Sequence, residues 1–441
     1  MIMEPSYPKR LIEVDLPIKE IGKHSAREKN IRKGHIATLH TWWARRPLAA
    51  CRAVLCAALW PDPADDNCPN SFKTFIKKEL QLHYDPLSIN NKINDRELRN
   101  LLLRFISDFA NWDNAPKKKF IKIANKITAQ AHLLFQNEGT QMPLVADPFA
   151  CGGAIPFETI RIGAESHASD LNPLPILLNT CTNIFIPKYG DKLSSEFLKA
   201  SKEIGDKTKL RLRKYYPKLN KNEEIIAYSW SRTYTCSGPS CGIEVPMLKQ
   251  MWLSKQSKND AAMRWVRDKD GNILVGANKK PKIELFKPKK ASDVENGNVA
   301  RGKATCPVCG YTASNDIIKK QMIEKNGGAK SSRLMAVRIQ NLKTKRREYR
   351  LPVKEDHRAI ELVEKDLYEL TRDDYYRALL PNETTPKGGG SGASRAFSLH
   401  RYGIYKFNDL FNNRQLLSML VLWKEIDRHL SRKKYNEFIK A

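Results

Sequence analysis

Four of the nine cysteines stand in two close pairs, an arrangement typical of metal ligands. Cys236 and Cys241 are separated by four residues, and Cys306 and Cys309 by two. Thiolates on such short turns can face one ion, and four of them complete the tetrahedral shell of a structural zinc ion. We therefore expect one Zn²⁺ bound by all four, in a ribbon interrupted by an insertion at about residues 253–300. The alternatives are reduced cysteines in ordinary loops and a redox pair at Cys306 and Cys309, for which no thioredoxin-like context is present.

A glycine turn at residues 147–153, DPFACGG, is the second candidate site. It follows an apolar segment and precedes a helical one. This order predicts a strand at about 143–147, a helix at about 154–162 and a second strand at about 165–170, which together form one β-α-β unit.

The residues of this unit favour a ligand that carries positive charge. Gly152 and Gly153 let the backbone approach a ligand closely, so a side chain at Gly153 is expected to block that approach. Asp170 ends the second strand, where an acid can accept hydrogen bonds from ribose hydroxyls. The turn lacks the G-x-G-x-x-G pattern of pyrophosphate sites, and Asp147 at its mouth suits a cation. S-adenosylmethionine, with its sulfonium, ammonium and ribose groups, fits these requirements; the alternative is a plain glycine turn with an unrelated aspartate.

The segment LHTWWARRPLAACRAV at residues 39–54 places aromatic faces beside fixed cations. The guanidinium groups of Arg45 and Arg46 are planar forks that match a carboxylate. The ring of Trp43 offers a face to a sulfonium or a base. The alternative is a buried aromatic packed under a surface arginine pair.

Taken together, these motifs resemble those of large prokaryotic adenine-specific DNA methyltransferases that carry a zinc ribbon and an N-terminal domain of unknown function. The matching text runs across nearly the whole chain: LIEVDLPIKEI, HSAREKNIRKGH, LHTWWARRPLAACRAV, WDN at 112–114, DPFACGG, and YGIYKFNDLFNNRQLL at 402–417. Cys151 stands where many relatives have glycine, and we expect it to be tolerated there rather than to do chemistry.

The resemblance implies roles for the residues of these motifs. In that family the glycine turn holds the methionine part of S-adenosylmethionine, and a segment before it closes over the methionine carboxylate. The acid after the second strand holds the ribose, and the next two residues lie near the adenine ring. The implied cofactor-binding residues are Trp43, Arg45, Arg46, Asp147, Pro148, Phe149, Ala150, Gly152, Gly153, Asp170, Leu171 and Asn172. The implied substrate is DNA, which the family methylates at an amino group of adenine. The implied role is restriction-modification or anti-phage defence.

The catalytic motif of that family, Asp/Asn/Ser-Pro-Pro-aromatic, has no counterpart in the chain. No two of the 24 prolines are adjacent. In the family the motif follows the text that resembles residues 402–417, and this chain ends at Ala441. We therefore expect the chain to be inactive alone, either because a second polypeptide supplies the motif or because that half is missing. The alternative is a non-catalytic, zinc-ribbon, nucleic-acid-binding subunit with a degenerate methyltransferase fold.

The charge balance also indicates a polyanionic partner. Lys+Arg number 77 against Asp+Glu 48, a net charge of +29, and nucleic acid is the commonest ligand of such chains. Two clusters stand out: Lys279, Lys280, Lys282, Lys287, Lys289 and Lys290, and then Lys343, Lys345, Arg346, Arg347 and Arg350. Solvated lysines are the alternative account. The longest apolar stretch, residues 48–60, is too short for a membrane span and no secretory signal is present, so we expect a cytoplasmic protein that does not contact membranes.

With the resemblance, these sites imply an α/β fold: a Rossmann-like methyltransferase core, incomplete on its C-terminal side, with an inserted four-cysteine zinc ribbon and helical additions. Five segments are expected: an N-terminal domain at 1–60, a helical insertion at 61–140, the S-adenosylmethionine-binding core at 141–232, the zinc ribbon at 233–315, and a helical region at 316–441. Apolar periodicity or composition predicts helices at about 47–60, 95–112, 117–136, 190–232, 316–325, 355–371 and 412–430, and GGGSGAS predicts a linker at 388–394.

Overall fold

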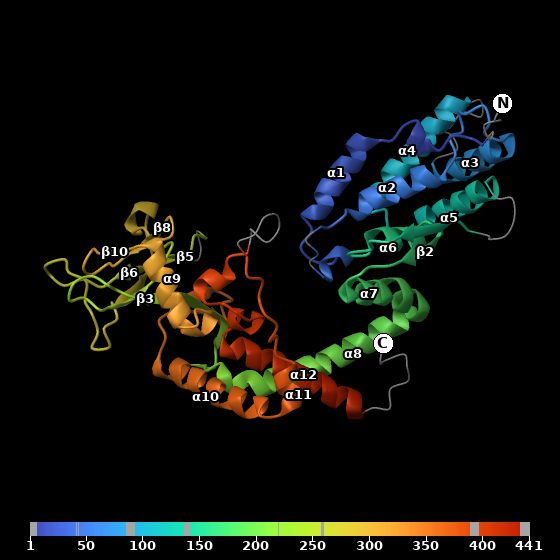
Figure 1. The fold of residues 1–441 in the computed structure, drawn as a ribbon. Helices are drawn as coiled ribbons and strands as arrows, with labels where there is room; N and C mark the ends of the chain where they lie inside the picture. The colour runs from blue at the N-terminus through green and yellow to red at the C-terminus, as the bar shows by residue number, and fades with distance from the viewer. Residues whose placement is uncertain are drawn as a thin grey trace. The chain divides into compact units, whose positions relative to one another are not determined.

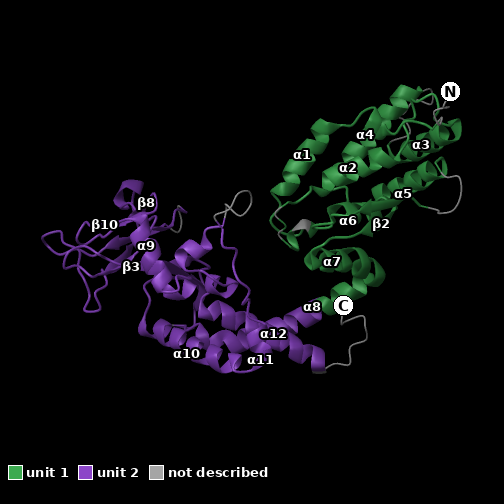
Figure 2. Ribbon diagram, viewed as in Figure 1, with its two compact units in different colours: residues 1–197, 435–441 green, residues 198–434 purple. Residues whose placement is uncertain are grey.

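The computed structural model describes residues 7–40, 42, 44–84, 93–135, 142–218, 220–256, 260–388 and 397–432. The chain divides into two compact units, residues 1–197 with 435–441 and residues 198–434 (Figure 2). None of the helices in the described ranges combines the length and the apolar character that a membrane span needs.

Helices dominate the first unit (Figure 1): α1 (Ile18–Lys29), α2 (Leu48–Leu59), α3 (Asn70–His83), α4 (Asp95–Ala110) and α5 (Lys118–Leu133). The helices expected at 47–60, 95–112 and 117–136 are confirmed as α2, α4 and α5. The sequence did not indicate α1, whose residues are mostly charged, or α3, which follows a loop-like run of prolines and aspartates.

One hydrophobic core joins these helices to the start of the β-α-β unit. It contains buried residues from Leu11 to Ala164, with Trp60, Phe105 and Phe109 among its largest side chains. The segments expected as separate domains at 1–60 and 61–140 therefore share a core with the beginning of 141–232.

The β-α-β unit follows α5. Strand β1 (Leu144–Asp147) leads through the glycine turn into α6 (Ala154–Arg161), and β2 (Glu165–Ala168) returns beside β1. The two strands pair in parallel, with Val145 opposite Ser166, so the predicted order of strand, helix and strand is confirmed. The described residues form only these two strands here, and a larger doubly wound core stays a prediction.

Helical chain follows the second strand. α7 (Pro173–Asn179) continues into a π-helical turn (Thr180–Phe185) and then into α8 (Ile186–Leu212), which is broken at Gly190 with φ 53°. The helix expected over 190–232 is therefore correct as far as Leu212. It is wrong beyond that point, because residues 223–235 form a strand.

The second unit is built on a four-stranded antiparallel sheet in the order β12-β11-β3-β4. Its strands are β3 (Glu223–Thr235), β4 (Glu244–Pro246), β11 (Ser332–Asn341) and β12 (Arg347–Arg350). The first of them, EEIIAYSWSRTYT, is rich in the β-branched and aromatic residues that favour strands.

Two small sheets are inserted between β4 and β11. One contains β5 (Trp252–Ser254), β6 (Ala261–Trp265) and β7 (Ile283–Phe286), at the position expected for the insertion in the ribbon. The other contains β8 (Val299–Ala300), β9 (Lys303–Thr305) and β10 (Thr312–Ala313), and α9 (Asn315–Glu324) follows it.

Three helices complete the second unit: α10 (Lys354–Thr371), α11 (Asp374–Ala378) and α12 (Asn413–Arg432). α10 and α12 pack around a core that includes Val363, Leu367, Leu416 and Leu420. α9, α10 and α12 confirm the helices expected at about 316–325, 355–371 and 412–430. Apart from Gly388, the linker expected at 388–394 lies outside the described residues.

Candidate functional sites

The four paired cysteines come together in the second unit. Their Sγ atoms all lie within 4.8 Å of one another, with 3.5 Å between those of Cys236 and Cys309 and 3.9 Å between those of Cys241 and Cys306. Metal–sulfur bonds of about 2.3 Å in a tetrahedral shell place the sulfur atoms about 3.8 Å apart, so both distances fit. These four cysteines can therefore hold one metal ion, as their spacing in the sequence predicted.

Two turns present the thiols to one another. Cys236 follows β3, and Cys306 follows β9. Gly238 has no room for a side chain, because its Cβ would lie 2.9 Å from the Cβ of Tyr311 and 3.1 Å from the Sγ atom of Cys309. The backbone N–H of Tyr311 lowers the pKa of Cys309 to about 7, which favours the thiolate that binds metal ions.

A pocket of about 300 Å³ lies in the first unit between the glycine turn and the segment that contains the arginine pair. This volume is at the lower end of the range for small-molecule sites. Seven of the expected cofactor-binding residues line it: Arg45, Arg46, Asp147, Phe149, Ala150, Gly152 and Gly153. Two motifs separated by about a hundred residues thus meet at one cavity.

The arginine pair lines the pocket and has no charge partner among the described residues. Arg45 and Arg46 are exposed, and neither forms a hydrogen bond or ion pair among the residues that the structure describes. Trp42 is buried and packs on the turn, since a Cβ at Gly152 would lie 3.5 Å from the Cβ of Trp42. Trp43, which was expected to contact the cofactor, lies outside the described residues.

Asp147 also lines the pocket. Asp147 is buried, and its Oδ1 atom accepts a hydrogen bond of 3.1 Å from the N–H of Phe149. The carboxylate keeps further acceptor capacity toward the pocket that it lines. The ring of Phe149 is 79% exposed, so it lies at the mouth rather than in the protein core.

The two glycines of the turn differ in what surrounds them. Gly153 has φ 78°, and a Cβ there would lie 2.8 Å from the Oδ1 atom of Asn179. A side chain at Gly153 would therefore meet Asn179 within the protein, an obstacle that the sequence did not indicate. Cys151 also has a positive φ, 49°, a conformation in which glycine is less strained.

Asp170 connects the end of the second strand to the glycine turn. Its Oδ2 atom accepts a hydrogen bond of 2.9 Å from the N–H of Cys151, and its Oδ1 atom accepts one of 2.9 Å from the N–H of Asn172. These backbone donors, Asn172 first and then Cys151, lower the pKa of Asp170, so the carboxylate is held in its ionised form.

Four expected cofactor-binding residues do not line the pocket: Pro148, Asp170, Leu171 and Asn172. Leu171 is fully exposed. The side chain of Asn172 caps α7 by accepting a hydrogen bond of 3.0 Å from the N–H of Leu174, which is a structural role.

The sequence missed several residues of the pocket. His40 and Trp42 come from the segment before the arginine pair, and Leu178 and Thr182 come from α7 and the π-helical turn. His40 and Trp42 stand within the LHTWWARR segment, so their sequence position beside the arginine pair could have indicated them. Leu178 and Thr182 carry no local signal, because only the fold of α7 brings them to the glycine turn.

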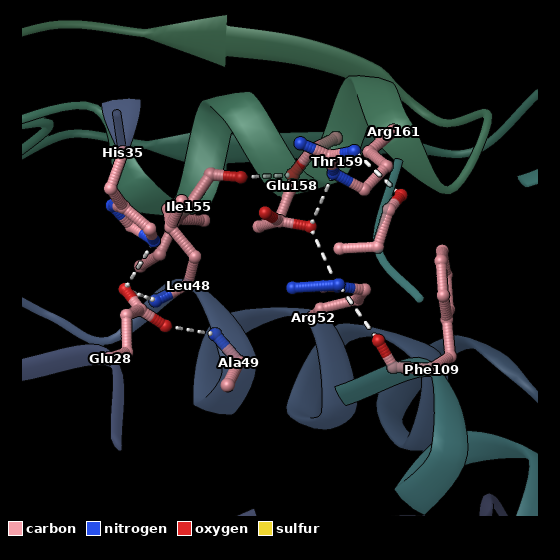
Figure 3. A network of polar contacts seen from close by, with 11 residues as sticks. Glu28, His35, Leu48, Ala49, Arg52, Phe109, Ile155, Glu158, Thr159 and Arg161 are labelled. Atoms are coloured by element: carbon pink, nitrogen blue, oxygen red, sulfur yellow. Dashed lines mark hydrogen bonds and ion pairs between the residues drawn. The ribbon is translucent and has the colours of Figure 1, made fainter. Parts of the chain in front are cut away.

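A buried network holds the arginine-bearing segment in place (Figure 3). The carboxylate of Glu28, on α1, accepts hydrogen bonds from the N–H groups of Leu48 and Ala49 at 2.8 and 3.0 Å. These are free donors at the start of α2, so Glu28 acts as the N-terminal cap of the helix that follows the arginine pair. The Nε2 atom of His35 lies 3.5 Å from the same carboxylate, and burial lowers the pKa of His35.

Glu158, on α6, is the second acid of this network (Figure 3). Its Oε2 atom lies 3.0 Å from the Nε atoms of both Arg52 and Arg161. Arg52 also donates to the carbonyl of Phe109 at 2.8 Å. Glu158 and Arg52 are almost fully buried; burial raises the pKa of Glu158, and the two guanidinium groups oppose that change. The pair therefore fixes α2 against the helix that leaves the glycine turn.

Two further contacts join the motifs that carry the resemblance. The ring of His35 lies 4.1 Å from that of Trp112, measured between centroids. Arg27 forms a two-pronged ion pair with Asp113, at 2.7 and 3.0 Å. The texts HSAREKNIRKGH and WDN are thus neighbours in the fold.

Not all residues of the second basic cluster, Lys343 to Arg350, are available on the protein surface. The Nε atom of Arg350 lies 3.1 Å from Glu223, and its other nitrogens bond Asp356 at 2.6 and 3.2 Å. Both acids are buried. Arg350 therefore belongs to the ion pairs that hold β12 to β3 and α10, and it is not available to a polyanion. In the first cluster, Lys280 lies 3.5 Å from Glu244.

Comparison with known proteins gives one match. The family described as "Protein of unknown function (DUF1156)" matches residues 15–82. The matched segment includes α1, α2 and α3, and also the arginine pair, which lines the pocket. No curated protein and no solved structure matches the chain. The chemistry of the sites therefore carries the functional argument.

Proposed function

We propose that the first unit binds S-adenosylmethionine in the pocket between the arginine pair and the glycine turn, as the cofactor-binding part of a DNA amino-methyltransferase that acts on adenine. The observation that carries the proposal is the distribution of charge around one cavity. Arg45 and Arg46, whose side chains have no hydrogen-bond or ion-pair partner among the described residues, line it together with Asp147. The methionine part of the cofactor bears a carboxylate and an ammonium group, so it is complementary to both.

Different residues of the pocket are proposed to bind different groups of the cofactor. Arg45 and Arg46 offer paired donors to a carboxylate. Asp147 can accept from an ammonium group, because only one of its acceptor positions is taken by the N–H of Phe149. Apolar neighbours such as Trp42 and Ile36 shield these contacts from water. The bound cofactor supplies an activated methyl group.

Asp170 supports the same site from outside the pocket. Each of its oxygen atoms accepts one backbone N–H and retains a lone pair for a ribose hydroxyl. Its bond to Cys151 also holds in place a turn that lines the pocket. In this proposal Asp170 contacts the ribose of the cofactor directly and also holds the glycine turn in place.

The second unit is proposed to engage DNA around a structural zinc ion. Four thiolates with no fifth ligand make a closed shell, which suits a structural rather than a catalytic zinc. The net charge of +29 supplies attraction to a phosphate backbone. This unit also supports the alternative function, a non-catalytic nucleic-acid-binding subunit, which needs DNA binding but no cofactor.

Transfer of the methyl group to an amine requires a hydrogen-bond acceptor on the protein that orients the amine. The sequence contains no Pro-Pro-aromatic motif to supply one. We therefore assign this step to residues outside the given sequence, in a second polypeptide or in a missing half of the same protein. A role in restriction-modification or anti-phage defence follows from the family resemblance.

Photochemical cross-linking of methyl-labelled S-adenosylmethionine tests the proposal. Label is expected in peptides that cover residues 36–46 or 147–157, and unlabelled S-adenosylhomocysteine should suppress it. An Asp113→Asn variant is the control and should be labelled like the wild type, because Asp113 forms an exposed ion pair with Arg27 and does not line the pocket. No methyl transfer to DNA is expected from the chain alone. Label outside these peptides would contradict the site, and DNA binding without cofactor binding would favour the alternative function.

A further inference from the structure

The turn between β11 and β12 joins a second, remote segment to form a compact basic surface. Leu342 in this turn donates its N–H to the carbonyl of Asn222 at 2.8 Å. Asn341 at the end of β11 is paired with Glu223 at the start of β3. The residues flanking this contact, Lys221 and Lys343, therefore stand beside each other although 122 positions (343 − 221) separate them in the sequence.

Four exposed cations make up this surface, which we call the hairpin patch: Lys221, Lys343, Lys345 and Arg346. None of the four has a hydrogen-bonded or ion-paired side chain among the described residues. The nearest acids of β3 are already engaged: Glu223 with Arg350, and Glu224 with Lys209 at 3.5 Å. Glu348, exposed on β12, is the acid that remains.

The turn that presents these cations is ordered by its own hydrogen bonds. The Oδ1 atom of Asn341 accepts from the N–H groups of Lys343 and Thr344 at 2.9 and 3.1 Å. The N–H of Asn341 donates to the carbonyl of Arg346 at 2.9 Å. The base of the hairpin is fixed by the buried ion pairs of Arg350. The charges are therefore carried on a prearranged hairpin, which lowers the entropy lost on binding.

We propose that the hairpin patch is the surface of the second unit that contacts the phosphate backbone of duplex DNA. A two-stranded hairpin is narrow enough to lie along a DNA groove, and unpaired lysines and arginines release counterions when they meet phosphates. The proposal deepens the proposed function, on which its choice of DNA rests, by naming the surface that binds it. Three of its residues belong to the second basic cluster that the sequence indicated, and Lys221 is added by the fold.

A pair of charge-matched variants tests the assignment. The patch variant carries Lys221→Gln, Lys343→Gln, Lys345→Gln and Arg346→Gln; the control carries Lys282→Gln, Lys287→Gln, Lys289→Gln and Lys290→Gln. Both lose four positive charges at exposed positions. Fluorescence anisotropy with a mixed-sequence duplex, over a series of salt concentrations, measures affinity and its salt dependence. Circular dichroism and metal content of each variant confirm that the second unit is folded.

The patch variant is expected to bind at least about 30-fold more weakly at 0.1 M salt, and its log–log salt slope should fall by about 3. The control should lose less than about 5-fold. Glu348→Gln, which removes the remaining acid, should tighten binding. Equal losses in the two variants, no binding of DNA by the wild type, or equally tight binding of polyglutamate to the patch would overturn the proposal. Calorimetry with S-adenosylmethionine should be the same for wild type and patch variant, so this outcome is separate from the test of the first unit.

Discussion

The Asp170 carboxylate accepts a hydrogen bond from the backbone N–H of Cys151 at 2.9 Å. This bond ties the end of β2 to the turn after β1, at a residue whose φ is 49°. The acid expected to hold a ribose therefore also holds the loop that lines the pocket. Substitutions at Asp170 have to be interpreted with both roles in view.

Asp170→Ala should weaken binding of S-adenosylmethionine by about tenfold or more, because charge-assisted hydrogen bonds are lost. Calorimetry measures this loss. Cys151→Gly made on top of Asp170→Ala relaxes the turn without restoring the carboxylate, so it separates the two roles. Recovery of affinity would assign the effect to the turn, and no recovery would assign it to contact with the cofactor. Equal affinity of wild type and Asp170→Ala would remove Asp170 from the site.

Gly153→Ala should destabilise the first unit by about 1–3 kcal/mol, because a Cβ meets Asn179 at 2.8 Å at a φ of 78°. Asn179 cannot easily move, since its amide donates to the carbonyl of Pro175 and accepts from Asn183. Gly152→Ala is the matched control: its Cβ would make an ordinary contact of 3.5 Å with Trp42. Denaturant unfolding compares the two variants, and similar losses of stability would contradict this view of the turn.

Glu158→Gln should cost about 3–5 kcal/mol of folding free energy, because it leaves Arg52 and Arg161 facing a neutral group inside the protein. Asp113→Asn breaks an ion pair whose side chains are more than half exposed, 52% for Arg27 and 56% for Asp113, and should leave the stability nearly unchanged. Thermal or denaturant unfolding of both variants gives the comparison. A Glu158→Gln variant as stable as wild type would show that the buried pair does not fix α2 to α6.

Purified protein should contain one zinc ion per chain, bound by Cys236, Cys241, Cys306 and Cys309. Cys306→Ser should lower the metal content and loosen the second unit, because metal binding and folding of such a site are coupled. Cys68→Ser, at a buried thiol of the first unit, is the control that should keep the metal. Elemental analysis under reducing conditions provides the count, and protein without metal would argue against the site.

Local patterns explain what the sequence predicted correctly. α4 was recognisable because Leu98, Leu102 and Phe105 recur at helical spacing, and its start is marked by Asn94, whose side chain accepts from the N–H of Glu97. The cysteine pairs were recognisable because the two cysteines of each pair are only a few residues apart. Such signals do not depend on the rest of the fold.

Non-local pairing explains what the sequence did not predict. The sequence analysis assigned β3 to a helix although Pro217 interrupts the helical text before it, and the partner that makes it a strand, β11, begins about a hundred residues later. The capping of α2 by Glu28 was missed for the same reason, since the acid lies 20 residues before Leu48. The pocket itself depends on such contacts: spacing identified the arginines and the glycine turn separately, and only the fold brings them together.

Calorimetric titration of S-adenosylmethionine into the purified chain tests the central claim most directly, with wild type, an Arg45→Ala/Arg46→Ala variant and an Arg27→Ala control compared under one condition. We expect saturable binding at one site by wild type and by Arg27→Ala, and a loss of about 2–4 kcal/mol for the double variant, because the methionine carboxylate loses its charged donors. Absence of heat from wild type, or equal affinity for all three proteins, would contradict the assignment of this pocket to S-adenosylmethionine.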